Sequence, residues 1–166
     1  ADHYCAVTNP ASCFTQNRAT LHLHGGLTPW ISDGTPHQWI TPAGENTAYP
    51  KGVSVQYVPD MWFDAAGNVQ LSTACTDAAD CISKGFSNNP GDGKLTFYYT
   101  NQQSARLMFY HDHAFGITRL NVYAGEAAGY LLVDPTESKL TDGTTAGVPA
   151  MDQLPLVIQD KSFVSD

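Results

Sequence analysis

Two His-X-His pairs constrain this chain more than any other feature of its sequence. They are His22-Leu23-His24 and His111-Asp112-His113, and together they hold four of the six histidines. Alternate side chains of a β-strand point to the same side, so each pair can aim two imidazole rings at one point. The pairs therefore predict two strands whose histidines converge on one side of a β-structure.

Converging neutral imidazoles are typical ligands of copper, zinc or iron, and they do not suit calcium or magnesium. Residues 105–113 read ARLMFYHDH, so Leu107 and Phe109 share the parity of the second histidine pair. We expect those histidines to continue an inward-facing apolar row, with Asp112 pointing away from it. A single buried histidine is more often a hydrogen-bonded core residue, but four in two such pairs favour a metal site.

Composition argues against several other classes of function. The chain has 166 residues, a net charge of −8 and 42% hydrophobic residues, with no apolar run near the length of a membrane span. An acidic chain of this kind is a poor partner for nucleic acid or for an anionic membrane. The length predicts one domain, residues 1–166, with enough chain to bury a core.

The four cysteines form two pairs that are close in sequence, Cys5 with Cys13 and Cys75 with Cys81. None adjoins a histidine and none belongs to a Cys-X-X-Cys motif, so local disulfides are favoured over thiolate metal ligands. Disulfides indicate an oxidising compartment, which predicts a secreted or periplasmic protein. Four cysteines allow three pairings, and the sequence leaves the other two open.

The fold class follows from apolar segments of period two. Short alternations separated by turns of Gly, Pro, Asn and Asp indicate an all-β sandwich or barrel. The stretch 117–128 predicts a short helix after the second histidine pair, and the spans 61–94 and 138–149 are interpreted as loops. The expected strands are 20–23, 52–58, 95–100, 130–133 and 156–158.

Four strings in the sequence are more specific than its composition. They are HLHGG at 22–26, Ser-Asp-Gly at 32–34, Asn-Gln-Gln at 101–103 and YHDHAFGITRLNVYAG at 110–125. Together they resemble the first cupredoxin domain of multicopper oxidases, especially the bacterial spore-coat laccase and bilirubin-oxidase type. The resemblance runs from about residue 20 to residue 163, interrupted by the loop, and implies a Greek-key cupredoxin-like β-sandwich.

The resemblance also implies roles for individual residues. His22 would bind the type 2 copper of a trinuclear cluster, and the type 3 pair would be bound by His24, His111 and His113. These four would be half of the ligands of the cluster. Asp33 matches an acidic residue that assists proton delivery during dioxygen reduction, although Asp in Ser-Asp-Gly is equally a turn former.

Some parts of the family pattern are missing from this sequence. It has no His-Cys-His segment for a type 1 copper and no third or fourth His-X-His motif. We therefore expect a piece of a larger oxidase, incomplete at its N-terminal side and inactive alone, whose residues 150–166 lead toward a second domain. The implied partners are the remaining cupredoxin domains, in cis or as separate chains, dioxygen, and a small reducing substrate such as a phenol.

Two other functions remain open on the residues alone. One is a non-catalytic copper-binding or structural protein derived from the same fold. The other is a zinc hydrolase, which usually adds a nearby Asp ligand and an activated water; the outward Asp112 counts against it. The two remaining histidines, His3 and His37, are isolated in Pro-, Asn- or Gly-rich settings and are interpreted as loop residues.

Overall fold

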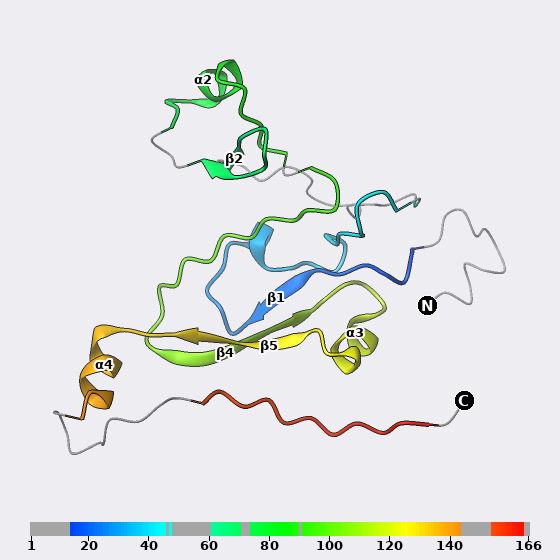
Figure 1. The fold of residues 1–166 in the computed structure, drawn as a ribbon, viewed down its shortest axis with the longest axis vertical. Coiled ribbons are helices and arrows are strands. Elements are labelled where there is room, and N and C mark those ends of the chain that lie inside the picture. The colour runs from blue at the N-terminus through cyan, green and yellow to red at the C-terminus, as the bar shows by residue number, and fades with distance from the viewer. Residues whose placement is uncertain are drawn as a thin grey trace.

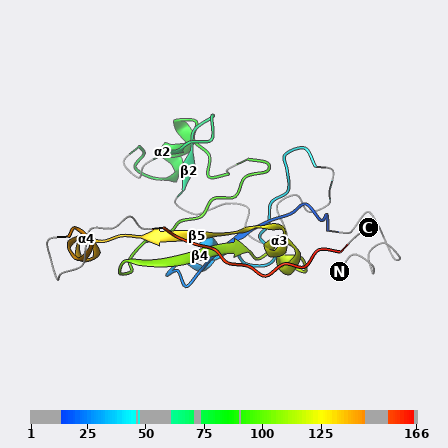
Figure 2. The same cartoon turned by 60° about the horizontal axis from the view of Figure 1, so that its bottom comes forward.

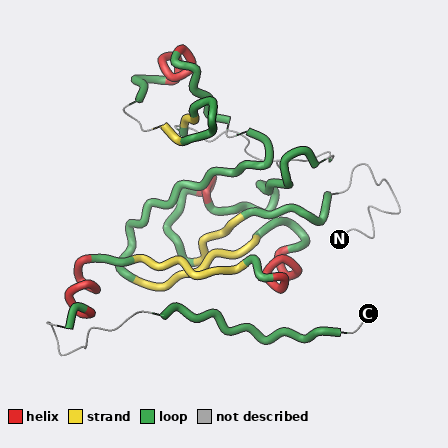
Figure 3. Tube along the Cα trace, in the orientation of Figure 1, coloured by secondary structure: helices red, strands yellow, loops and turns green. Residues whose placement is uncertain are grey.

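An antiparallel three-stranded sheet carries the histidine pairs. The computed structural model describes residues 14–45, 47, 61–70, 74–89, 91–143 and 154–164. The strands are β1 (Leu21–His24), β4 (Arg106–Asp112) and β5 (Ala127–Leu132), in the order β1-β4-β5 (Figures 1 and 3). The predicted all-β, cupredoxin-like class is confirmed, since the described helices are short and lie outside this sheet.

Helix α3 (Thr118–Ala124) connects β4 to β5 and begins where the sequence predicts a helix. It ends earlier than predicted because Gly125 adopts a left-handed φ of 120° and donates its N–H to the carbonyls of Asn121 and Val122. A left-handed glycine at this position terminates a helix. The following residues are then available to β5, which pairs with β4 from His111↔Ala127 to Arg106↔Leu132.

In the part of the chain that the structure describes, two small clusters form the core around the sheet. Leu23, Met108 and Leu132 form the first, against which Tyr99, Tyr110 and Tyr130 pack. The second consists of Trp39, Ala114 and Ile117, with Phe14 against it. The first cluster buries one face of the three-stranded sheet, and the second packs the residues that follow β4 against the segment around residue 39.

The other face of the sheet is the one that carries the histidines, and the expectation that it points inward is wrong. Leu107 is 53% exposed and Phe109 45%, whereas Met108 is 6% exposed and Asp112 fully buried. Asp112 does point away from the histidines, but it points into the protein. Within the described chain, the segment 154–164 runs alongside the sheet (Figures 1 and 2), and its residues 156–159 line a groove together with His24 and His111.

The predicted loop 61–94 contains short elements of its own. Strands β2 (Trp62–Phe63) and β3 (Val69–Gln70) form a hairpin, and helix α2 (Ala78–Ser83) follows. These elements lie apart from the three-stranded sheet in both views (Figures 1 and 2). The predicted disulfide Cys75–Cys81 is confirmed, with a Cα–Cα distance of 5.2 Å. The predicted partner disulfide, Cys5–Cys13, lies outside the described residues.

Other predicted elements differ from the structure. Residues 95–100 form no ladder; side-chain hydrogen bonds attach them instead, with Tyr98 N–H donating to Ser32 Oγ at 2.8 Å. Residues 156–158 form no strand and are exposed. The loop predicted from 138 is preceded and partly replaced by α4 (Pro135–Thr141), which Asp134 caps by accepting the Glu137 N–H.

The predicted strands 20–23 and 130–133 correspond to β1 and to the end of β5. The predicted strand 52–58 lies outside the described residues. Among the residues that the structure describes, no helix has the length and apolar character needed to span a membrane.

Candidate metal centre

The pairing of β1 with β4 gathers the histidine rings on one face. His22 lies directly opposite His111 in the antiparallel register, and Leu23 lies opposite Tyr110. His113 follows the end of β4, and its backbone N–H donates to Thr20 O at 3.0 Å, which continues the same register. Since alternate residues share a face, all four imidazoles lie on the same side of the two strands.

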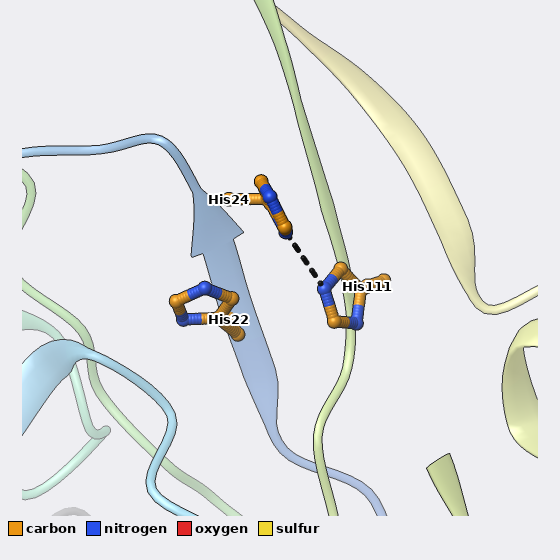
Figure 4. Close-up of side chains that lie close together, drawn as sticks. All are labelled: His22, His24 and His111. Atoms are coloured by element: carbon orange, nitrogen blue, oxygen red, sulfur yellow. Dashed lines mark hydrogen bonds between the residues drawn. The ribbon is translucent and has the colours of Figure 1, made fainter. Parts of the chain in front are cut away.

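The rings are close together as well as on one side. The ring centroid of His22 lies 5.6 Å from that of His24, 5.5 Å from that of His111 and 5.2 Å from that of His113. Three of the four, His22, His24 and His111, offer ring nitrogens that all lie within 4.8 Å of one another (Figure 4). The fourth, His113, lies beside this group and is not part of it at that distance.

Backbone carbonyls orient two of the rings. His22 Nδ1 lies 2.7 Å from Asp33 O, and His111 Nδ1 lies 2.6 Å from Asp112 O. A carbonyl only accepts, so each Nδ1 must carry the proton and each Nε2 keeps its lone pair. Metal-binding histidines are commonly held in this way by the nitrogen that does not bind the metal.

His113 differs from these two rings. Its Nδ1 is buried and has no hydrogen-bond partner among the described residues. A buried ring nitrogen without a partner is costly, and a metal ion would satisfy it. Imidazoles with available lone pairs are a donor set that suits copper, so the residues present fit that ion.

The turn that contains Asp33 packs directly on β1. The 3₁₀ helix η2 (Trp30–Ser32) ends at Asp33, and Gly34 follows with a φ of 72°. A Cβ at Gly34 would collide with the backbone of Leu21, so only glycine permits this approach. The approach places Asp33 Oδ1 3.4 Å from His22 Nδ1, and Thr28 Oγ1 donates to the same oxygen at 2.9 Å. Asp33 is therefore both a turn residue and a neighbour of the histidine group.

Sequence reasoning assigned no role to two residues beside the group. Gln103 Nε2 donates to Gly25 O at 2.8 Å and its Oε1 accepts the Leu27 N–H at 2.9 Å, which holds the loop after His24. The Phe109 ring stacks on that of His24 with centroids 4.6 Å apart. The parity of Phe109 could have suggested its contact. The loop contact of Gln103 could not have been predicted, because no local sequence pattern distinguishes a glutamine that holds a loop from a solvated glutamine.

The two leftover histidines do not join the group in the described part of the chain. His37 is exposed and stacks on Phe115 with ring centroids 4.9 Å apart, as a loop residue can. His3 lies outside the described residues. The histidine face also borders a groove of about 600 Å³ between the sheet and residues 156–159.

Comparison with known proteins shows the relationships of the chain. No family model matches it. It is 40% identical over 125 residues to a bilirubin oxidase of Albifimbria verrucaria, which covers 74% of this chain and 21% of that protein. It is 29% identical to a laccase of Bacillus subtilis, over 90% of this chain and 20% of the laccase. It is 30% identical to the multicopper oxidase LPR1 of Arabidopsis thaliana, over 88% of this chain and 18% of that oxidase.

The chain thus spans about a fifth of the length of the curated relatives that it matches. The relatives from these three organisms are a bilirubin oxidase, a laccase and a multicopper oxidase. The matches cover most of this chain, and they agree with the antiparallel sheet and its histidine group. By sequence, this chain is a member of the multicopper oxidase family.

Proposed function

We propose that this chain is a segment of a copper-dependent oxidase that couples one-electron oxidation of a phenol-like or other reducing substrate to the reduction of dioxygen to water. The observation that carries the proposal is the convergence of His22, His24 and His111 from two adjacent strands. Bound copper would supply one-electron redox chemistry, which imidazole ligands support.

The chain would provide half of the ligands of a trinuclear copper cluster. In this proposal His22 holds the type 2 ion, and the type 3 pair is held by His24, His111 and His113. The other ligands, and the type 1 site, would come from further cupredoxin domains, in cis or on separate chains. The greater length of the relatives supports a need for such domains.

The residues of this chain have distinct tasks in the proposal. The carbonyls of Asp33 and Asp112 hold the protons of His22 and His111 at Nδ1, so that each Nε2 keeps a lone pair for a metal ion. The Asp33 carboxylate, 3.4 Å from His22 Nδ1, would hold and pass a proton during dioxygen reduction. Phe109 covers one face of the His24 ring and restricts its rotation.

We also propose that the protein is secreted or periplasmic. The disulfide Cys75–Cys81 supports this, because such bonds persist in oxidising compartments. Cell fractionation with a non-reducing peptide map tests it: recovery of the mature protein in the cytosol with free thiols would contradict the proposal.

The test of function begins with residues 1–166 alone. The purified chain is titrated with Cu²⁺ and with Zn²⁺ in parallel. It should bind copper more tightly than zinc, and it should bind fewer than three copper ions per chain. It should show no intense blue absorption and no phenol-dependent dioxygen consumption, because it contains no thiolate site for electron entry. Sustained turnover by the pure chain would refute the proposal that other domains supply the remaining copper ligands. A strong preference for zinc over copper would favour a hydrolase.

A second measurement separates an oxidase from a non-catalytic copper protein. When this chain is assembled with the missing domains and loaded with copper, dioxygen consumption should accompany substrate oxidation. Copper bound at full stoichiometry without any dioxygen consumption would support the non-catalytic alternative.

A further inference from the structure

We propose that Asp112 is a positioning residue that holds His113, and through it the second histidine pair, in register with β1. The metal-binding part of this inference rests on the proposed function, whereas the part that concerns backbone geometry does not. Asp112 is fully buried on the opposite side of β4 from the histidines, and nothing in the oxidase proposal uses its carboxylate.

Both carboxylate oxygens of Asp112 accept backbone N–H groups. Oδ1 accepts the N–H of Thr20 at 3.0 Å, and Oδ2 accepts the N–H of Ala114 at 3.1 Å. Thr20 immediately precedes β1, and Ala114 immediately follows His113. One side chain thus connects the start of the first histidine strand to the turn that leaves the second.

These bonds surround His113 at the point where regular pairing ends. Strand β4 stops at Asp112, so the ladder does not include His113. Its backbone is held by the bond from its own N–H to Thr20 O at 3.0 Å, and Thr20 is in turn bound to Asp112. The carboxylate therefore extends the β1–β4 connection by one residue, and that residue is the fourth histidine.

His113 depends on this backbone support more than two of the other histidines do. His22 and His111 are oriented by their own Nδ1–H bonds to carbonyls, at 2.7 and 2.6 Å. His113 Nδ1 has no partner in the described chain. No hydrogen bond with a described residue holds the ring at Nδ1, so a shift of the His113 backbone would change the position of the ring relative to His22, whose ring centroid lies 5.2 Å away.

The burial of Asp112 also supports a positioning role for this residue. A buried carboxylate is costly when its hydrogen bonds come from neutral amides, and no ion pair among the described residues includes Asp112. A cation held by the flanking histidines would offset part of that cost. A carboxylate at this position thus favours both the geometry of the pair and the binding of a positive ion.

The first experiment uses the unsubstituted chain and needs no metal. Amide hydrogen exchange and NMR of residues 1–166 should show slow exchange and downfield N–H signals for Thr20 and Ala114, as expected for donors to a carboxylate. Exchange of both amides at the rate of an unprotected chain would overturn the proposal, whatever a variant does.

The second experiment compares Asp112→Asn with a matched control, Asp134→Asn. Asp134 lies just beyond β5, beside the opposite end of β4, where it accepts the N–H groups of Ala105 and Glu137 at 2.9 and 2.8 Å. Both aspartates thus hold two backbone amides, but among the described residues no histidine ring contacts the amides that Asp134 holds. Each substitution should lower the melting temperature.

Only Asp112→Asn should weaken Cu²⁺ binding, by about tenfold or more, and change the ring signals of His113. Asp134→Asn should change the Kd for Cu²⁺ by less than about twofold. Equal Cu²⁺ affinity and unchanged His113 signals in Asp112→Asn would overturn the positioning role and leave the oxidase proposal intact. Failure of the unsubstituted chain to bind Cu²⁺, with Thr20 and Ala114 protected, would instead count against the copper site alone.

Discussion

His22 and His111 lie directly opposite each other across the β1–β4 pair, with ring centroids 5.5 Å apart. A shift of one residue in this register would move one pair to the buried face, because side chains alternate along a strand. The two motifs are separated by about half of the chain, and this single pairing brings them together.

His111→Ala should weaken Cu²⁺ binding by the isolated chain by more than about 100-fold, beyond the range typical of residues that only support a ligand. His111 is central to the group, since it faces His22 and its Nε2 lies 3.4 Å from His24 Nδ1. His37→Ala is the matched control, because His37 is an exposed histidine outside the group. Calorimetric titration of both variants provides the measurement. Similar losses in the two would show that copper binds to histidines at large.

Asp33→Asn should leave the copper content of the assembled oxidase nearly unchanged. The reason is that His22 is held by the backbone carbonyl of Asp33, which the substitution preserves. Dioxygen reduction should slow, on the order of 100-fold if the carboxylate passes protons. Metal analysis and single-turnover reoxidation measure the two effects, with the exposed Asp160→Asn as a control. Unchanged reoxidation would leave Asp33 with its turn-forming role only.

Gln103→Leu should destabilise the chain by roughly 1–2 kcal/mol, since two hydrogen bonds to the loop 25–27 are lost. Gln102→Leu, the adjacent residue, makes neither of these bonds and should have a smaller effect. Chemical unfolding of both variants gives the free energies. In addition, Gln103→Leu should broaden the His24 ring signals. Equal unfolding free energies for the two variants would argue against the loop contact.

Acid should destabilise the chain through specific aspartates. Hydrogen bonds from two backbone N–H groups hold the pKa of Asp134 below its usual 3.8. The larger effect comes from Ala105 and the smaller from Glu137. The hydrogen bond from Lys84 lowers the pKa of Asp80 in the same direction. A carboxyl with a lowered folded pKa adds stability above its unfolded pKa, and this stability is lost as pH falls through the folded value.

The difference in unfolding free energy between the unsubstituted chain and Asp134→Asn isolates one of these groups. It should be constant from neutral pH to about pH 5 and should shrink below about pH 4. The comparison is needed because burial raises the pKa of Glu126, whose protonation opposes the acid effect. A difference that stays constant down to pH 2 would contradict the assignment to Asp134.

The histidine motifs and the period-two pattern predict much of what forms the site. Each motif specifies which residues share a face, and β1 and β4 carry the two pairs as expected. The pattern also predicts that the histidine face is the buried one, and this prediction is wrong. Leu107 and Phe109 are as apolar as core residues, yet they are exposed because little of the described chain covers their side of the sheet.

Two further elements differ from the prediction, one because it depends on distant residues and one in spite of a local signal. Residues 95–100 have the alternation of a strand, but the segment is held by the hydroxyl of Ser32 and not by a ladder. Helix α4 was missed although its signal is local, an Asp before Pro135 and a Glu in the first turn. The partnerships of Asp112 were not predictable, because Thr20 lies 92 positions away in sequence.

The contact between Gly34 and Leu21 has a consequence for how this sequence can vary over evolutionary time. Gly34 has no side chain with which to bind a metal ion or a substrate, yet any side chain there would meet the backbone of β1. A larger residue would lift the Asp33 turn and release the carbonyl that orients His22. In a library of all substitutions at each position, Gly34 should therefore tolerate as little change as the histidines of the group. The reason differs, because at Gly34 the space for a side chain is what is missing.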